Sequence, residues 1–368
     1  MNMLRLSDHE HASLLTEELG SSSDDFIIAR EVGPGVSRTA TAYNHVGDAY
    51  TRYADGESAE GVLAPANRFA RSDGIVWEAL CTAIDELHKA GVSTIRILDA
   101  GCGPGIWTKK IAEYARRNGL AVAVVGFDIS RTQLDLARSQ AAELFSRYPN
   151  DAKSTLEFLE HDLEKPLPWE NGYFHIVLCN YAVLNHIAES LLPRAIAEIC
   201  RVASVRVMAT MRAVGSPASA CIIGMEHVRE YRNDPSCGQL SLVLKDGSQH
   251  RLPFNMYSAQ AIEGFFAAHA SIVDIRALDV FVSRFAADEN WNASLLAGMP
   301  DRLAVVQRLK EMEDTLCRLP GWVDHGTHIL VVVQPKSVKD EDQSECPAGS
   351  EHDRVVTSFQ EFLKCQGT

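Results

Sequence analysis

The stretch that decides the fold is Ile97-Leu98-Asp99-Ala100-Gly101-Cys102-Gly103-Pro104-Gly105, in which an apolar run enters three alternate glycines. A helical pattern over Trp107–Asn118 follows. Glycine lets the backbone turn sharply and approach a ligand with no Cβ in the way. The first N–H groups of the following helix also lack partners within the helix. Together these features predict a ligand-binding loop, with a plain strand–turn–helix connection as the alternative.

The spacing of the glycines argues against two common nucleotide loops. A dinucleotide fingerprint needs GxGxxG, but position 106 is Ile, and the P-loop pattern GxxxxGK[ST] is absent. Asp99, just before the loop, would repel a pyrophosphate, whereas it suits a ligand that carries an amine. A nicotinamide oxidoreductase is therefore disfavoured.

Acidic residues follow the next strands. Asp128 ends the second strand-like run, 27 residues after Gly101. A carboxylate at that place can accept both hydroxyls of a ribose. The alternative role, capping the next helix, belongs more naturally to Ser130. Asp162 closes the third strand-like run, and the fourth ends at Asn180.

Strand-like and helix-like runs alternate through the middle of the chain, which predicts an α/β fold with a doubly wound, mainly parallel sheet covered on both faces. Ligands of such a sheet bind at the carboxyl ends of its strands. The predicted helices are Gly74–Ala90, Trp107–Asn118, Thr132–Phe145 and Leu191–Arg201. The predicted strands are Thr94–Asp99, Ala121–Phe127, Thr155–Glu160, Phe174–Asn180, Val205–Met211, Ser271–Leu278 and His328–Gln334.

Two segments, at about residues 213–268 and 284–320, interrupt this alternation. They contain a helix-like Ala220–Tyr231, a hairpin pattern from Leu240 to Phe254 and a helical run over Leu303–Leu319. We interpret them as an inserted cap region or as an oligomerisation surface, which would allow a homodimer. The expected domain spans 37–335.

The two ends of the chain have polar compositions. Residues 1–36 are expected to be flexible, and residues 336–368 form an acidic, mostly flexible tail. The N-terminus has no apolar segment of a secretory signal, and no apolar run reaches the roughly 18–20 residues of a membrane span. The nine cysteines are scattered without a CxxC pair, which favours reduced thiols. We therefore expect a cytoplasmic protein with no membrane partner.

The charge balance bears on possible partners. The chain has 368 residues and a formal net charge of −14. Such a charge opposes loose binding to nucleic acid, because phosphate binding depends on lysines and arginines. A metal-assisted mechanism would need a cluster of carboxylate ligands in the loops around the site, and Asn180-Tyr181-Ala182 supplies none, so no metal is expected.

On these motifs the chain resembles the class I S-adenosylmethionine-dependent methyltransferases over about residues 40–212. The DxGxGxG loop at 99–105, the acid at 128 and the Asp-Leu pair at 162–163 occur in the order and spacing of that family. The resemblance implies S-adenosyl-L-methionine as cofactor and a seven-stranded sheet whose last strand is antiparallel. One departure is Ala203-Ser204-Val205, which replaces the Pro-Gly-Gly turn that many members have before the fifth strand.

The resemblance also implies roles for individual residues in cofactor binding. The glycine loop would line the methionine end, Asp128 would hold the ribose hydroxyls and Asp162 would accept from the adenine amino group. Asn180 would lie near the transferred methyl. The complete set of expected cofactor-binding residues is Asp99, Gly101, Gly103, Gly105, Asp128, Ile129, Asp162, Leu163, Asn180, Tyr50 and Tyr53.

The two tyrosines of that set belong to an aromatic stretch from Tyr43 to Tyr53. Tyr50 and Tyr53 share one face of a helix at i, i+3. An aromatic ring can stabilise a sulfonium cation. The stretch resembles the helix that closes over the cofactor in family members that act on small molecules. A helix that serves packing alone is the alternative.

Methyl transfer from a sulfonium is an in-line displacement, so alignment of the acceptor with the methyl group supplies most of the rate acceleration. A hydroxyl acceptor also needs a base. His186 is the candidate, because it follows the fourth strand on the ligand side; a capping or surface histidine is the alternative.

The class of acceptor is narrowed by motifs that are missing. An Asn-Pro-Pro-Tyr-like tetrapeptide of base N-methyltransferases does not follow the fourth strand, and a Pro-Cys pair is absent. We therefore expect a small-molecule acceptor, methylated on oxygen or nitrogen. Methylation of protein or RNA, or a non-catalytic cofactor-binding regulator, remain as alternatives.

Overall fold

The structure of the protein is a computed structural model, which describes residues 37–46, 70–147, 153–216, 228–282 and 301–336. The predictions for residues 1–36, for Tyr50 and Tyr53 and for the tail beyond Lys336 concern residues outside these ranges.

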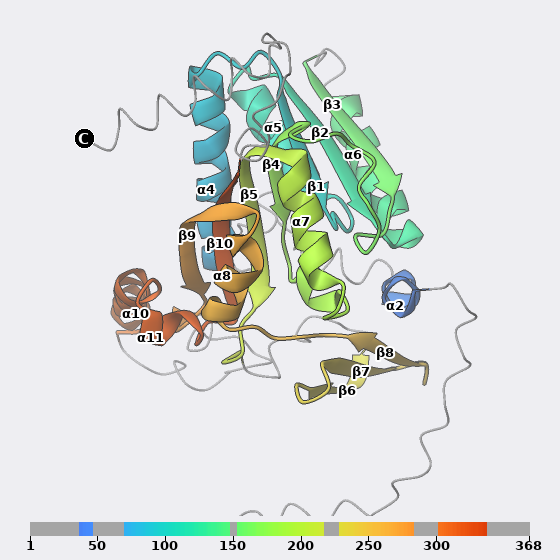
Figure 1. Ribbon diagram of the computed structural model, residues 1–368, viewed down its shortest axis with the longest axis vertical. Helices are drawn as coiled ribbons and strands as arrows, with labels where there is room; N and C mark the ends of the chain where they lie inside the picture. Colours follow the sequence, from blue (N-terminus) through green and yellow to red (C-terminus); the bar gives the residue numbers. More distant parts are fainter. Residues whose placement is uncertain (1–36, 47–69, 148–152, 217–227, 283–300, 337–368) are drawn as a thin grey trace, which may run out of the picture. The chain divides into compact units, whose positions relative to one another are not determined.

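Seven strands form the central sheet, in the order β3-β2-β1-β4-β5-β10-β9 (Figure 1). Their bounds are β1 Ile95–Ala100, β2 Val122–Asp128, β3 Ser154–Glu160, β4 Phe174–Cys179, β5 Ala203–Arg212, β9 Ala270–Leu278 and β10 His328–Pro335. Strands β1 to β5 pair in parallel, whereas β10 is antiparallel to both β5 and β9. The predicted doubly wound, mainly parallel seven-stranded sheet is confirmed, and its antiparallel strand is the last in the chain.

The sheet has an apolar core on each face, because successive residues of a strand point to opposite faces. Ile97 belongs to the core that contains side chains of α4 and α5, and its neighbour Leu98 belongs to the core under α7 and α8. Figure 1 shows α7 and α8 in front of the sheet. The helices are α4 Ala70–Lys89, α5 Ile106–Arg117, α6 Arg131–Arg147, α7 Leu192–Val202 and α8 Ala259–Ala267. Coverage on both faces explains why β4 is buried at every position.

The order of the strands places the site. From β1 the chain runs outward to β2 and β3 and then returns to β4, which pairs with the other side of β1. At such a switch point the connections after the two strands leave in opposite directions, which opens a crevice at their carboxyl ends.

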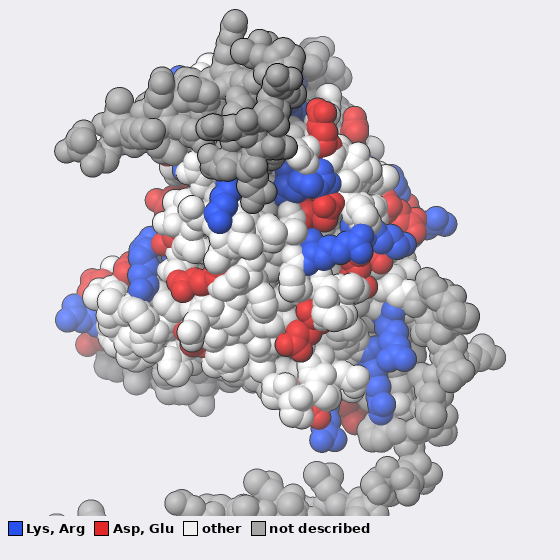
Figure 2. Space-filling view, viewed as in Figure 1, with Lys and Arg blue, Asp and Glu red and all other residues white. Residues whose placement is uncertain are grey.

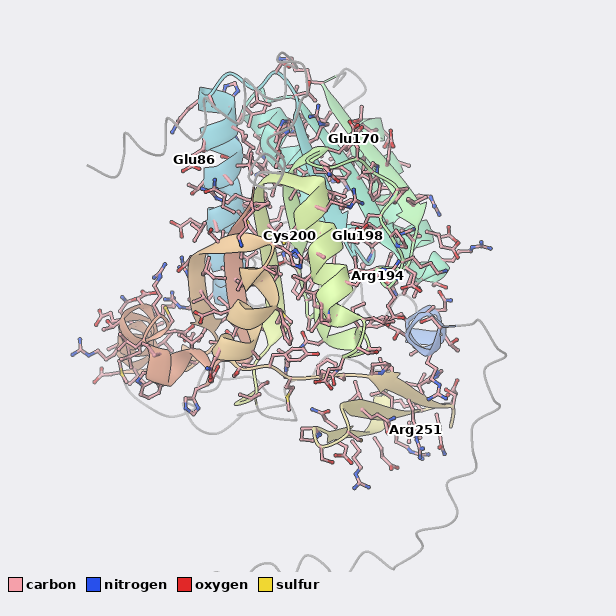
Figure 3. The ribbon with its side chains drawn as sticks, in the orientation of Figure 1. Glu86, Glu170, Arg194, Glu198, Cys200 and Arg251 are labelled. Carbon is pink, nitrogen blue, oxygen red and sulfur yellow. The ribbon has the colours of Figure 1, made fainter. Side chains whose placement is uncertain are left out.

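The junction between α7 and β5 departs from the family pattern as the sequence predicts. Val202 ends α7, and Ala203 begins β5 directly, with extended backbone angles. Arg201 pairs with Glu198 on the same helix and donates to the Leu167 carbonyl at 3.0 Å. Figure 3 shows Glu198 projecting from α7, where its carboxylate also accepts from the Leu167 N–H at 2.7 Å. These bonds fasten the segment after β3 to the helix.

A second, antiparallel sheet contains β6 Val228–Asp234, β7 Gln239–Leu244 and β8 Gln249–Pro253 in that order. The predicted hairpin is confirmed as β7 and β8. The predicted helix Ala220–Tyr231 is wrong from Val228 onward, and its earlier part lies outside the described residues. Pairing of β6 with β7 decides the outcome there, since β propensity depends on the neighbouring strand.

Helix α2, Arg38–Val46, packs on this second sheet. Their shared core consists of Ala42, Leu240, Leu242, Leu252 and Phe254. The predicted cap segment 213–268 divides in the structure, because α8 lies within it but packs on the main sheet through Ile262 and Phe266. The element that caps the strand ends is thus α2 together with the second sheet.

The second interruption contains α10 Arg302–Leu316 and the short α11 Pro320–Val323. The predicted helical run of this segment is confirmed in α10, although the helix ends at Leu316. No helix in the described part of the chain has the length and apolar character that crossing a membrane requires.

Truncation of Phe266 tests how much α8 contributes to the fold. This side chain is fully buried against the main sheet, so Phe266→Ala should lower the free energy of unfolding by about 3–5 kcal/mol. The control Leu303→Ala removes a side chain that is 85% exposed on α10 and should change it by about 0.5 kcal/mol or less. Urea denaturation measures both; similar losses would contradict the assignment of α8 to the core.

Candidate functional site

The glycine loop after β1 has the backbone that its sequence requires. Gly101, Gly103 and Gly105 all have positive φ, at 71°, 53° and 79°. A Cβ on Gly101 would overlap the side chain of Val183, and one on Gly105 would lie 2.9 Å from the Ala137 Cβ. Gly101 therefore permits close approach to the turn after β4, whereas Gly105 permits packing of α5 on α6.

Asp128 connects this loop to the end of β2. Its Oδ2 accepts from the Gly103 N–H at 2.9 Å and its Oδ1 from the Ser130 N–H at 2.8 Å. Burial raises the pKa of Asp128, and these backbone hydrogen bonds act in the opposite direction. Ser130 accepts from the Gln133 N–H at 3.3 Å, so the expectation that Ser130 caps the helix is confirmed. Each Asp128 oxygen retains acceptor capacity for a ligand hydroxyl.

A first cavity of about 880 Å³ opens at the carboxyl ends of β1, β2 and β4. It brings together most of the predicted site residues, namely Gly101, Gly103, Asp128, Ile129, Asp162, Leu163 and His186. Asp99, Gly105 and Asn180 do not line it.

Asp99 lies beneath the loop. It is buried, and its Oδ2 accepts from the Thr108 hydroxyl at 2.6 Å. Burial raises the pKa of Asp99 to about 6, with the bond from Thr108 opposing the shift and the charge of Asp128 adding to it. In the structure Asp99 fastens the first turn of α5 to the end of β1.

The end of the first cavity at Asp162 has hydrogen-bond acceptors next to an apolar surface. Asp162 uses Oδ1 to accept from the Glu164 N–H at 3.0 Å, and Leu163 is buried beside it. Nε2 of His161 is buried without a hydrogen-bond partner among the described residues. The His161 ring packs edge-on against Phe127, with 5.6 Å between ring centroids. Such a wall fits the polar edge and the flat face of a nucleobase.

Helix α2 closes over this cavity. The Asn44 side-chain oxygen accepts from the Ser130 hydroxyl at 2.7 Å and from the Thr132 N–H at 3.2 Å. One residue earlier, the Tyr43 hydroxyl lies 3.0 Å from Nε2 of His186. The part of the aromatic stretch that contains Tyr43 is thus helical and faces the cavity, whereas Tyr50 and Tyr53 lie outside the described residues.

The hydrogen bonds of His186 define its tautomer. Nδ1 lies 2.9 Å from the Pro253 carbonyl, which can only accept, so Nδ1 carries the proton. Nε2 then accepts from the Tyr43 hydroxyl. Burial lowers the pKa of His186 to about 4, and the bond to Pro253 opposes this shift. The ring is therefore neutral near pH 7.

A second cavity, of about 980 Å³, adjoins the first. Tyr43, Trp107, Tyr181 and His186 line both cavities. The second is otherwise bounded by Ala42, Ser72, Asp73, Val76, Asn180, Ala182, Thr210, Arg212, Leu240, Leu242, Leu252, Phe254, Leu278, Asp279 and His328. The structure thus places Asn180 toward the second cavity.

The turn after β4 sets the boundary between the two cavities. Tyr181 and Ala182 have positive φ, at 56° and 62°, a conformation that is costly without glycine and recurs at functional sites. It is held by the Tyr181 N–H, which donates to the Thr210 hydroxyl oxygen at 2.8 Å. The Tyr181 ring lies 6.1 Å from that of Trp107 between centroids.

Trp107, Tyr181 and Asp73 are site residues that the sequence analysis missed. Trp107 follows the glycine loop by two positions and Tyr181 follows Asn180, so their positions beside recognised motifs could have indicated them. Asp73 has no such neighbouring motif.

The chemistry of the walls of the first cavity fits S-adenosylmethionine. Glycines would allow the methionine chain to pass close to the backbone, carboxylates would accept hydrogen bonds from the hydroxyl and amino groups, and apolar surface lies between them. The described residues contain no group of three or more His, Cys, Asp or Glu side chains that could hold a metal ion.

Comparison with known proteins agrees with this site. Residues 97–205, which span β1 to the start of β5, match a family described as "Methyltransferase domain". The demethylmenaquinone methyltransferase of Lactococcus lactis subsp. lactis is 33% identical over 25% of this chain and 32% of its own length. The ubiquinone biosynthesis O-methyltransferase of Bartonella tribocorum is 26% identical over 47% of this chain and 65% of its own. The matches thus span less than two thirds of each relative.

Among solved structures, the magnesium protoporphyrin IX methyltransferase of Synechocystis PCC 6803 with bound S-adenosylmethionine aligns with a TM-score of 0.43. It is 12% identical over 82% of this chain and 99% of its own. The family match assigns a methyltransferase domain to residues 97–205, and the strand order and the glycine loop are those that the resemblance to the class I S-adenosylmethionine-dependent methyltransferases implies. S-adenosylmethionine is the cofactor of this family.

Substitution of Asp128 tests the cofactor site. Asp128→Ala should weaken the binding of S-adenosylhomocysteine by about 1.5–3 kcal/mol, because hydrogen bonds to a charged group are lost. Calorimetry measures the affinity, and denaturation the smaller loss of stability from the freed Gly103 N–H. Glu160→Ala is the control, since that side chain is half exposed at the end of β3. An unchanged dissociation constant for Asp128→Ala would limit its role to fastening the loop.

The lowered pKa of the partly buried His186 predicts a pH dependence of stability. Its folded pKa, about 4, lies below the ordinary value of 6.5, so the unfolded chain binds a proton that the folded chain excludes between these values. The stability is thus present above about pH 6.5 and is lost as the pH falls toward 4, by up to about 3 kcal/mol. His186→Asn should reduce this fall, measured by denaturation at pH 7 and 4.5. The control His88→Asn, at the exposed end of α4, should leave this loss of stability unchanged. An equal loss of stability in the unaltered protein and in both variants would contradict the prediction.

Proposed function

We propose that this protein transfers a methyl group from S-adenosylmethionine, bound in the first cavity, to a small organic acceptor bound in the second. The observation that carries the proposal is the meeting of the two cavities at Tyr43, Trp107, Tyr181 and His186. A methyl donor and an acceptor in adjoining cavities can be aligned at that boundary, and alignment supplies most of the rate acceleration of a displacement.

Bound S-adenosylmethionine supplies a methyl group activated by a positively charged sulfur. For this cofactor we propose that Asp128 holds the ribose hydroxyls and that Asp162 and Leu163 receive the adenine. Gly101 and Gly103 would let the methionine end pass close to the backbone, as their positive φ and the proximity of Gly101 to Val183 support.

Aromatic side chains at the boundary have two proposed tasks. The rings of Tyr43, Trp107 and Tyr181 would exclude water from the reacting groups. The faces of such rings also attract a cation. The Tyr181 ring is held in place by the strained turn after β4 and by its hydroxyl, which donates to Asp73 at 3.2 Å.

His186 remains our proposal for the residue that receives a hydrogen bond from the reacting group. Its Nε2 is an acceptor in the wall shared by the two cavities. A ring with a pKa of about 4 holds a proton weakly near pH 7, so it suits an acceptor hydroxyl or amine that takes the place of the Tyr43 hydroxyl. Methylation on oxygen or nitrogen is compatible with this role.

Three observations support a small-molecule acceptor. The two relatives reported above are named for demethylmenaquinone and for ubiquinone biosynthesis, both of which involve small molecules. The second cavity has a mainly apolar wall with a few polar side chains, as small-molecule sites do. On the face in Figure 2, Lys and Arg are interspersed with Asp and Glu, and the net charge of −14 disfavours nucleic acid. We also propose a cytoplasmic location, on the expected reduced state of the cysteines; a homodimer through the cap stays a prediction.

Methyl incorporation tests this function. The protein is incubated with methyl-labelled S-adenosylmethionine and an extract of its source organism, which is then separated into small-molecule, protein and RNA fractions. We expect label in the small-molecule fraction and S-adenosylhomocysteine as coproduct, both reduced at least tenfold by Asp128→Ala and unchanged by Glu160→Ala. Label in protein or RNA would overturn the acceptor class. Cofactor binding without any turnover would indicate a regulatory protein.

A further inference from the structure

The second cavity has two chemically different ends. Leu240, Leu242, Leu252 and Phe254 from the second sheet provide an apolar end. The end at the main sheet is polar and is lined by Ser72, Asp73, Asn180, Thr210, Arg212, Asp279 and His328. A ligand that fills this cavity must therefore have an apolar body and a polar head.

Several polar atoms in the wall of the second cavity have no hydrogen-bond partner among the described residues. Both amide atoms of Asn180 are in this state, although the residue is only 4% exposed. The Ser72 hydroxyl oxygen and the Trp107 Nε1 are likewise buried and unpartnered. Buried polar groups are nearly always hydrogen-bonded. Four buried atoms without a partner around one cavity therefore indicate that a polar ligand forms hydrogen bonds with them.

Asp73 gives this end its chemical preference. It is buried in the first turn of α4 and accepts from the Tyr181 hydroxyl through Oδ2 at 3.2 Å. Asp279, just after β9, faces the same cavity. Burial first, and then the charge of Asp279, raise the pKa of Asp73 well above its ordinary value. A negatively charged head would meet two carboxyl groups, whereas an N–H or O–H donor would find acceptors.

The opposite charge at this end lies toward β5 and β10. Arg212 Nη1 is 3.5 Å from Nε2 of His328, and the Asn185 oxygen accepts from the Arg212 N–H at 2.9 Å. Arg212 thus contacts His328, whereas Asp73 contacts Tyr181, so a head that binds at Asp73 and Asn180 meets a carboxyl group.

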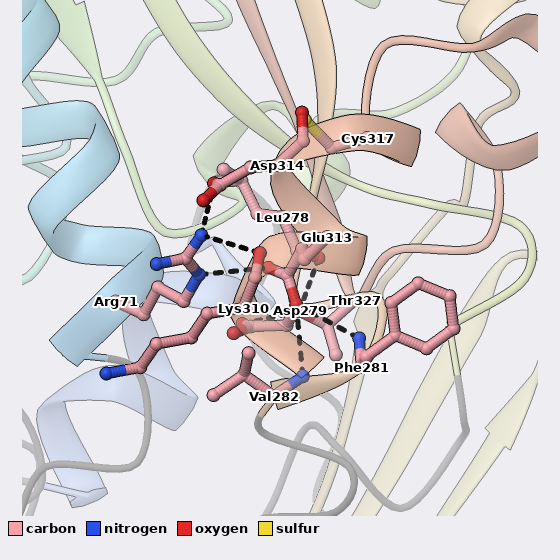
Figure 4. Close-up of polar contacts among 10 residues, drawn as sticks. All are labelled: Arg71, Leu278, Asp279, Phe281, Val282, Lys310, Glu313, Asp314, Cys317 and Thr327. Carbon is pink, nitrogen blue, oxygen red and sulfur yellow. Dashed lines mark hydrogen bonds and ion pairs between the residues drawn. The ribbon is translucent and has the colours of Figure 1, made fainter. Parts of the chain in front are cut away.

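The chain segments next to the two carboxyl groups are held by helix α10, and Figure 4 shows its contacts with Arg71, Phe281 and Val282. Arg71, two residues before Asp73, forms ion pairs with Asp314 and Glu313 of α10. The Glu313 carboxylate also accepts from the N–H groups of Phe281 and Val282, at 3.1 and 3.0 Å.

Asp279 itself has a positive φ of 58° and accepts from the Thr327 hydroxyl at 2.9 Å. Helix α10 thus fixes both chain segments that carry the carboxyl groups, and a rigid arrangement of this kind favours specific recognition.

We propose that the second cavity selects an acceptor with an apolar, ring-sized body and a neutral or cationic head that donates hydrogen bonds, and that Asp73 and Asn180 recognise this head. The inference rests on the proposed function, since it names the class of molecule that the second cavity would offer to the methyl donor.

Three probes that share one ring test this selection: benzylamine, phenol and benzoate, with a cationic, a neutral donating and an anionic head. Their binding to the full chain saturated with S-adenosylhomocysteine is measured by ligand-observed NMR titration. We expect benzylamine and phenol to bind at least tenfold more tightly than benzoate. Benzoate binding as tightly as the other two would overturn the proposal. This comparison uses only the unaltered protein, so its outcome does not depend on whether a variant folds.

Variants assign the selection to residues. Asp73→Asn should weaken the binding of benzylamine at least tenfold and reduce the ratio of its affinity to that of benzoate. Leu242→Ala should instead weaken the binding of all three probes to a similar extent. Glu78→Gln is the matched control, because it removes a carboxylate from an exposed position of the same helix and should change nothing. An unchanged ranking in folded Asp73→Asn would overturn the role of Asp73.

The same samples separate failure of the inference from failure of the proposed function. Calorimetric titration with S-adenosylhomocysteine alone reports on the first cavity. Absent binding there contradicts the proposed function, while intact binding there with unselective probes contradicts only the inference.

Discussion

The two backbone hydrogen bonds accepted by Asp128 are the interaction on which the rest of the site depends. They join the glycine loop after β1 to the end of β2 through Gly103 and Ser130. Ser130 in turn holds Asn44 of α2, and α2 brings Tyr43 to His186. One partly buried carboxylate thereby fixes the glycine loop at the first cavity and the position of the helix above it. A carboxylate can do both because each oxygen accepts more than one hydrogen bond.

The turn after β4 converts one crevice into two cavities. Its left-handed residues, Tyr181 and Ala182, direct the chain across the switch point of the sheet, and Thr210 on the neighbouring β5 holds them there. Since Gly101 has no side chain, Val183 can lie against the glycine loop. The two cavities consequently share part of their walls, so a change in this turn would affect both of them.

The second cavity, where we propose that the acceptor binds, is built mainly by elements added around the main sheet. The second sheet supplies apolar side chains, and its Pro253 carbonyl sets the tautomer of His186. On the opposite side α10 reaches α4 and the segment after β9 through Arg71 and Glu313. Because these elements belong to no part of the matched region 97–205, relatives that share only that region need not share the acceptor pocket.

The sequence by itself determined the main sheet, the glycine loop and the acid at position 128, because strand periodicity is local and the carboxyl ends of parallel strands must converge. Only the tertiary structure decided that Val228–Asp234 is a strand, since a partner strand stabilises it. It also decided that Asn180 faces the second cavity and that Asp73 lies beside Tyr181, 108 residues away. Burial and pairing of polar groups arise from contacts between distant elements, and these contacts leave no periodic pattern in the sequence.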